Sequence, residues 1–121
     1  MVYYEILSGI WIGSIDILTN INFLKDNNIG LLINCTNNYE FPDMNIKKIR
    51  LSLSDNFSEA YNCINSNKTK ILELIYNNMD IENILIACYD GERISPYIIT
   101  LFIKEYGNNI DDNFNPKMDE S

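Results

Sequence analysis

The sequence predicts a single α/β domain in which a central, mostly parallel sheet is flanked by helices. Two short, continuously apolar segments, 31–35 and 84–88, are typical of strands that are covered on both faces. Segments with helical periodicity lie between and after them, and this alternation is the pattern of a parallel sheet with crossover helices. With 121 residues, 46% of them hydrophobic, the chain is long enough for one core.

The first part of the chain predicts a hairpin, a helix and a buried strand. Residues 6–12, interrupted by Gly9, predict two short strands that meet at a turn. Residues 14–26 predict a helix, because apolar side chains recur at three-residue spacing and Ser14 is available as a cap. The run 31–35 then predicts the first buried strand.

The second part continues the alternation. Residues 46–51 alternate like a strand with one solvent-facing side, and 58–78 carry two helical patterns. The buried strand 84–88 precedes a last helix over 95–106. We therefore expect a domain over residues 1–106, followed by a polar, acidic and flexible tail over 107–121.

Composition excludes several classes of function. The net charge of −8 disfavours a nucleic-acid surface, and no apolar run is long enough to span a bilayer. The absence of histidine excludes histidine-based catalysis and histidine-ligated zinc, and three scattered cysteines predict neither a metal site nor a disulfide framework. We expect no cofactor, no metal, no nucleic-acid or membrane partner, and an intracellular, cytoplasmic location with buried thiols.

The segment 84–96 is the most informative one for chemistry. An apolar strand ends in Cys88, a short loop with Gly91 follows, and Ser95 and Pro96 predict the N-cap and first residue of a helix. A loop between a strand and a helix N-terminus directs backbone N–H groups at an anion. The alternative, a buried cysteine that ends a core strand before an ordinary loop, stays open on these residues alone.

The wider sequence resembles the dual-specificity branch of the cysteine-dependent protein phosphatases. Residues 10–14 (Ile-Trp-Ile-Gly-Ser) are similar to the family's opening strand, and 29–36 (Ile-Gly-Leu-Leu-Ile-Asn-Cys-Thr) to its second strand. Residues 51–55 (Leu-Ser-Leu-Ser-Asp) resemble the loop that supplies its general acid. The resemblance spans about residues 6–106 and implies the cysteine-phosphatase fold, shortened at the C-terminus.

The resemblance also implies a phosphate-binding loop with a degenerate signature. The family pattern is His-Cys-x-x-Gly-x-x-Arg-Ser, and an ungapped alignment places Ala87 at the histidine and Ile94 at the arginine. Cys88 falls on the nucleophile. The implied loop residues are Tyr89, Asp90, Gly91, Glu92, Arg93, Ile94 and Ser95.

These departures weaken an anion site. Isoleucine offers neither the charge nor the planar donor fork of arginine, and Asp90 and Glu92 add like charge beside a site for a dianion. A one-residue shift that brings Arg93 into the arginine position is the less favoured register. We expect Arg93 to face solvent or to pair with Asp90 or Glu92.

Asp55 and the other two cysteines each allow a structural and a functional interpretation. Asp55 is either a turn residue or, by the resemblance, a general acid whose role is vestigial without the arginine. Cys35 and Cys63 are expected to be buried rather than redox partners of Cys88, although a thiol near the loop would be able to form a regulatory disulfide.

The sequence therefore supports three functional hypotheses. The first is a pseudophosphatase, inactive or severely impaired, that acts by binding a protein partner, phosphorylated or not. The second is an atypical active protein tyrosine or serine/threonine phosphatase that uses Cys88 and Arg93. The third is a self-associating scaffold domain, because a C-terminus shorter than in the family would leave apolar surface for a homodimer.

Overall fold

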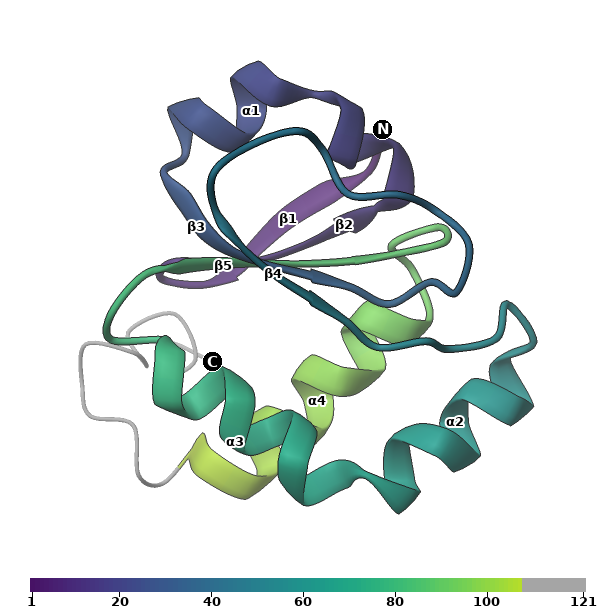
Figure 1. The fold of residues 1–121 in the computed structure, drawn as a ribbon. Coiled ribbons are helices and arrows are strands. Elements are labelled where there is room, and N and C mark those ends of the chain that lie inside the picture. Colours follow the sequence, from purple (N-terminus) through teal and green to yellow (C-terminus); the bar gives the residue numbers. More distant parts are fainter. Residues whose placement is uncertain (108–121) are drawn as a thin grey trace.

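A computed structural model describes residues 1–107 of the chain, which form a five-stranded sheet between two layers of helix (Figure 1). The elements in chain order are β1 (Tyr3–Leu7), β2 (Ile10–Ser14), the 3-10 helix η1 (Ile15–Thr19), α1 (Ile21–Asp26), β3 (Ile29–Asn34), β4 (Lys47–Arg50), α2 (Phe57–Ser66), α3 (Lys68–Asn78), β5 (Asn83–Cys88) and α4 (Ile94–Tyr106).

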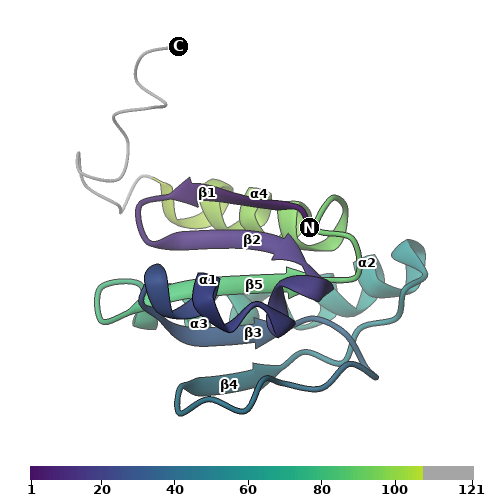
Figure 2. The ribbon, with the colours of Figure 1, turned by 90° about the horizontal axis from the view of Figure 1, so that it is seen from above.

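The sheet has the order β1-β2-β5-β3-β4, with β5 at its centre (Figure 2). Only the β1–β2 pair is antiparallel; β2–β5, β5–β3 and β3–β4 are parallel. The predicted α/β class with a mostly parallel sheet is confirmed. Because strands β2, β3 and β5 point the same way, their carboxyl ends meet at one edge of the sheet.

Helices cover both faces of the sheet, so its central strands are buried on both sides. In Figure 1, η1 and α1 lie on one face and α2, α3 and α4 on the other. The buried side chains form two clusters, one on each face of the sheet. In the smaller cluster, Leu32 and Leu85 pack with η1 and α1. In the larger cluster, Ile33 and Ile86 pack with α2, α3 and α4. Successive residues of β3 and β5 therefore serve opposite cores, which explains their continuous apolar runs.

The segment 14–26 differs from the single helix predicted. It is divided into η1 and α1 because Asn20 stands between them, and the Asn20 side chain accepts a hydrogen bond from the N–H of Phe23 at 3.0 Å. An asparagine cap starts a new helix at this point. Ser14 precedes η1 but makes no capping bond; its hydroxyl contacts Val2 and Asp16 instead.

The remaining elements match the predicted order, with one correction to burial. Asn67 separates α2 from α3, which correspond to the two helical patterns predicted over 58–78. Cys35 and Cys88 are buried as expected, but Cys63, on α2, is exposed. Within residues 1–107, none of the helices is both long and apolar enough to cross a membrane.

Candidate functional site

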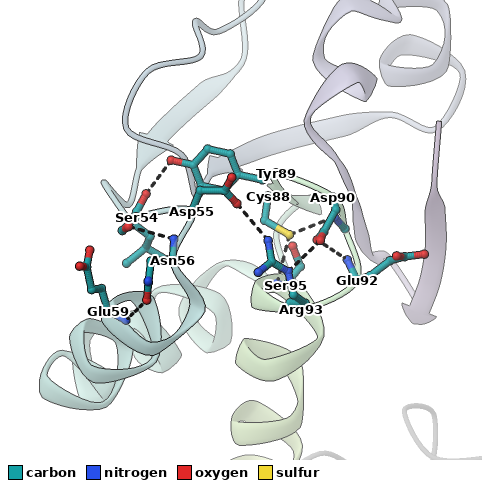
Figure 3. Close-up of polar contacts among 12 residues, drawn as sticks. Ser54, Asp55, Asn56, Glu59, Cys88, Tyr89, Asp90, Glu92, Arg93 and Ser95 are labelled. Carbon is teal, nitrogen blue, oxygen red and sulfur yellow. Dashed lines mark hydrogen bonds and ion pairs between the residues drawn. The ribbon is translucent and has the colours of Figure 1, made fainter.

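Cys88 lies where the sequence predicts it, at the carboxyl end of the central strand β5 (Figure 3). The loop 89–93 connects it to α4. Cys88 is completely buried, at 0% exposure, and its side chain belongs to the larger core cluster. The predicted strand–loop–helix arrangement is thus confirmed.

Backbone N–H groups of the loop converge on the Cys88 sulfur. The N–H groups of Gly91 and Ser95 both donate to Sγ, at 3.2 and 3.4 Å. The Ser95 side chain is also fully buried, and its hydroxyl has no hydrogen-bond partner among the described residues. This arrangement of donors around a strand end is the geometry of an anion cradle.

Gly91 is required by the shape of the loop. Its φ of 74° lies in the left-handed region, and a Cβ at this position would stand 2.6 Å from the Ser14 nitrogen and 2.7 Å from the Gly13 carbonyl carbon. The loop therefore rests directly on the backbone at the end of β2. No other residue type fits here without movement of one of the two segments.

The helix after the loop begins earlier than predicted. Ile94, not Pro96, is the first residue of α4, and Arg93 rather than Ser95 is the N-cap, without a side-chain capping bond. Ser95 and Pro96 lie in the first turn, where the missing N–H of a proline does no harm. Ser95 does not act as a cap because it lies inside the first turn, and its N–H donates to the Cys88 sulfur.

Ile94 is a core residue. It is 1% exposed and packs in the larger cluster between the sheet and the helices. The position that the family alignment assigns to arginine is therefore occupied by an apolar side chain that contributes to packing. Of the described residues 88–95, only Arg93 carries a positive charge.

Arg93 binds two carboxylates at the mouth of the loop. Its Nε donates to Asp90 Oδ2 at 2.8 Å and one terminal nitrogen donates to Asp55 Oδ1 at 3.0 Å (Figure 3). The predicted pairing with Asp90 is confirmed, whereas Glu92 is not a partner. Asp55 comes from the segment before α2, so the ion pair joins two loops that are 38 residues apart.

The charges at the loop mouth shift two pKa values. Partial burial raises the pKa of Asp90, but hydrogen bonds from the Glu92 N–H and the Arg93 guanidinium outweigh it, and the pKa is lower than usual. Hydrogen bonding to Asp90, reinforced by Asp55, raises the pKa of Arg93. The guanidinium is thus satisfied by protein carboxylates rather than presented to an external anion.

Tyr89 holds the loop from the other side, which the sequence did not indicate. Its hydroxyl donates to the Leu53 carbonyl at 2.8 Å and accepts from the Asn37 N–H at 3.2 Å. One side chain thereby joins the loops that follow β3, β4 and β5. A tyrosine next to a candidate nucleophile was the only signal available in the sequence.

Cys35 lies beside Cys88 on the neighbouring strand. The Cys35 N–H donates to the Ala87 carbonyl at 2.8 Å, which continues the β3–β5 register by one residue. Burial raises the pKa of the Cys35 thiol well above its ordinary value, and the nearby Cys88 raises it further. Both thiols are free, and residues 1–107 contain no group of acidic or cysteine side chains suited to a metal ion.

Comparison with known proteins agrees with this geometry. No family model and no curated protein matches the chain. Among solved structures, DUSP15 superimposes with a TM-score of 0.76 at 17% identity, covering 88% of this chain and 67% of that one. The chain has the dual-specificity phosphatase fold.

Two further neighbours share that fold. A mouse putative dual specificity phosphatase complexed with zinc tungstate gives a TM-score of 0.71 at 16% identity, over 87% of this chain and 65% of that one. OH1 from the Orf virus, a tyrosine phosphatase, gives a TM-score of 0.69 at 15% identity, over 88% of this chain and 62% of that one. The chain thus spans about two-thirds of the length of these structures.

Proposed function

We propose that this protein is a catalytically inactive or severely impaired dual-specificity-phosphatase-like domain that acts by binding a protein partner. The observation that carries the proposal is the pair of neighbours Ile94 and Arg93. The first fills the expected arginine position with a buried apolar side chain, and the second is held outside the cradle by Asp90 and Asp55.

Electrostatics disfavours catalysis at this site. Transfer of a phosphoryl group to Cys88 develops negative charge that needs preorganised donors, and loss of one such donor costs about 10²–10³-fold in rate. A fork of charged donors contributes more than a single neutral one. Asp55 and Asp90 place two carboxylates on the one guanidinium at the mouth and Glu92 adds a third acidic residue to the loop, so the local field opposes a phosphate dianion.

The cradle supports a retained binding function. Two N–H groups still point at the Cys88 sulfur, and the buried Ser95 hydroxyl lacks a partner within the described residues. An unsatisfied buried hydroxyl costs about 1–3 kcal/mol, which an incoming acceptor would offset. A phosphoryl oxygen or a carbonyl oxygen of a partner supplies such an acceptor, so the site is suited to a partner that is phosphorylated or not.

Hydrolysis of a small aryl phosphate tests the loss of catalysis. We expect the wild-type protein to show no turnover above that of Cys88→Ser, because the cation that stabilises the transition state is missing. A kcat/KM close to that of active dual-specificity phosphatases, abolished by Cys88→Ser, would overturn the proposal.

Binding to arrays of phosphotyrosine, phosphoserine and phosphothreonine peptides tests the retained function. We expect binding that Gly91→Ala abolishes, because the added Cβ collides with the backbone at Gly13 and Ser14. Gly107→Ala is the matched control. A Cβ at this position would lie 3.8 Å from Ile103 Cγ2, an ordinary contact distance, so this variant should bind like wild type. If both variants bind equally well, the partner does not bind at this loop.

A second candidate is an atypical phosphatase in which Arg93 leaves its carboxylate partners and enters the cradle. The observation in its favour is that Arg93 already contacts Asp55, the residue aligned with the family's general acid. This candidate predicts turnover that is lost in both Cys88→Ser and Arg93→Ala. Turnover that is lost only in Cys88→Ser would argue against a role for Arg93.

A further inference from the structure

A groove of about 430 Å³ lies between the edge strand β4, the segment that follows it and helices α2 and α3. Its walls are mainly apolar, and three of their side chains, Ile49, Leu51 and Leu74, are only partly buried. None of its lining residues belongs to the 88–95 loop. The groove is therefore a surface separate from the candidate site, with a volume in the range of ligand-binding clefts.

The rim of the groove is basic in an otherwise acidic protein. Two of its ten lining residues, Arg50 and Lys70, are basic and none is acidic, although the net charge of the whole chain is −8. Lys70 lines the groove and is exposed. Arg50 also lines it, and its guanidinium donates to the backbone carbonyls of Thr36 and Tyr39, which do not neutralise its charge.

Such a groove fits a segment that combines carboxylates with large apolar side chains. The chain contains one: residues 108–121 hold four acidic residues and one basic residue, and Ile110, Phe114 and Met118 recur at every fourth position. These residues lie outside the part of the chain that the structure describes. We propose that the groove binds this C-terminal segment of the same molecule, with Phe114 or Met118 between β4 and α3.

The end of α4 gives the segment a suitable starting point. Tyr106, the last residue of α4, stacks on Tyr76 of α3 with ring centroids 4.4 Å apart, so the chain continues from a place beside a helix that also forms the groove. Fourteen extended residues span at most about 45 Å, and the seven residues from Gly107 to Phe114 span at most about 23 Å. A domain of this size has a radius of gyration of about 13 Å, so the groove is within reach.

Attachment to the same chain makes a weak interaction sufficient. A short tether gives an effective concentration in the millimolar range, so a groove affinity of ~0.1 mM would leave the groove about 90% occupied. Cys63 lines the groove and is the exposed cysteine, whereas Cys35 and Cys88 are buried. Occupation of the groove should therefore protect one native thiol from alkylation.

The rate at which N-ethylmaleimide alkylates Cys63 in the full chain tests this proposal. We expect slow alkylation in wild type and about tenfold faster alkylation in the double variant Phe114→Ser, Met118→Ser, because a groove that is about 90% occupied leaves Cys63 accessible about one tenth of the time. Lys70→Glu should also accelerate the reaction, and so should ~1 M salt, which screens charges beyond about 3 Å. Combining Lys70→Glu with Asp112→Lys should restore protection.

Two controls make the result decisive. Lys25→Glu reverses a charge on α1, on the opposite face of the sheet, and should leave the Cys63 rate unchanged; Cys63→Ser gives the background from the buried thiols. Equal Cys63 rates in wild type and in the Phe114/Met118 variant would overturn the proposal. Protection that rises with protein concentration would overturn it too, because the segment would then come from a second copy.

Discussion

Replacing Ile94 with arginine restores the family signature in sequence, yet we expect Ile94→Arg to destabilise the domain rather than to repair it. Ile94 is 1% exposed and packs in the larger core cluster. A guanidinium at this position would be a buried charge with no partner, and such an uncompensated charge costs about 3–5 kcal/mol. For a domain of about 100 residues, 1 kcal/mol shifts the Tm by roughly 4–8 °C, so the Tm should fall by at least about 12 °C.

Thermal melts followed by circular dichroism, with and without sulfate, measure this effect. Ile94→Val is the matched control for volume and should cost only about 0.5–1.5 kcal/mol. Ile81→Arg is the control for charge: Ile81 is 70% exposed, so this variant should melt like wild type. If Ile94→Arg melts at the wild-type temperature and sulfate raises its Tm, the side chain points into the cradle and the assignment of Ile94 to the core is wrong.

Three further predictions concern the loop. Gly91→Ala should lower the free energy of unfolding by more than about 1 kcal/mol, because φ is 74° and the new Cβ meets backbone, whereas Gly107→Ala should not; urea unfolding compares them. Tyr89→Phe should lose about 1 kcal/mol in the same assay, since the hydroxyl that joins the three loops is removed; an unchanged midpoint would show that this bond contributes nothing. The lowered pKa of Asp90 predicts stability that is present above about pH 4 and lost as pH falls through the folded pKa. Asp90→Asn should therefore be less stable than wild type at pH 7, by under about 1 kcal/mol because the ion pair with Arg93 is exposed. Near pH 2 the two proteins should be equally stable. A difference in stability that persists in acid would show that it does not come from the charge of Asp90.

The parts of the fold that the sequence predicted are those governed by periodic burial. Strands β3 and β5 are recognisable because residues on both of their faces enter a core, and helix α3 because its apolar side chains share one face. The sequence predictions failed where a single polar side chain decides between alternatives. Asn20 divides the segment 14–26 because its side chain accepts a hydrogen bond from the Phe23 N–H, and the spacing of apolar residues does not predict this bond.

The candidate site was predicted in its chemistry but not in its contacts. The pattern from Cys88 to Ser95 indicated the loop, and the departure at Ile94 indicated the missing cation. Serine before proline favoured Ser95 as the N-cap and Pro96 as the first helical residue, but α4 begins two residues earlier, at Ile94, which packs in the core. The bond from Arg93 to Asp55 joins residues 38 positions apart, a contact that depends on how two loops are placed over the sheet.

The contact of Gly91 with the backbone of Gly13 and Ser14 has a consequence for the order of folding. The cradle is complete only when β2 has paired with β5, and these strands are separated by about seventy residues of intervening chain. Pairings between such distant segments form late, because the entropy of closing the loop must be overcome before the contacts stabilise it. During synthesis the N-terminal hairpin has to wait until the strand that ends in Cys88 has left the ribosome. The site is therefore among the last parts of the molecule to form, and slow pairing of β2 with β5 would leave Cys88 temporarily exposed to oxidants and alkylating agents that do not reach it in the native state.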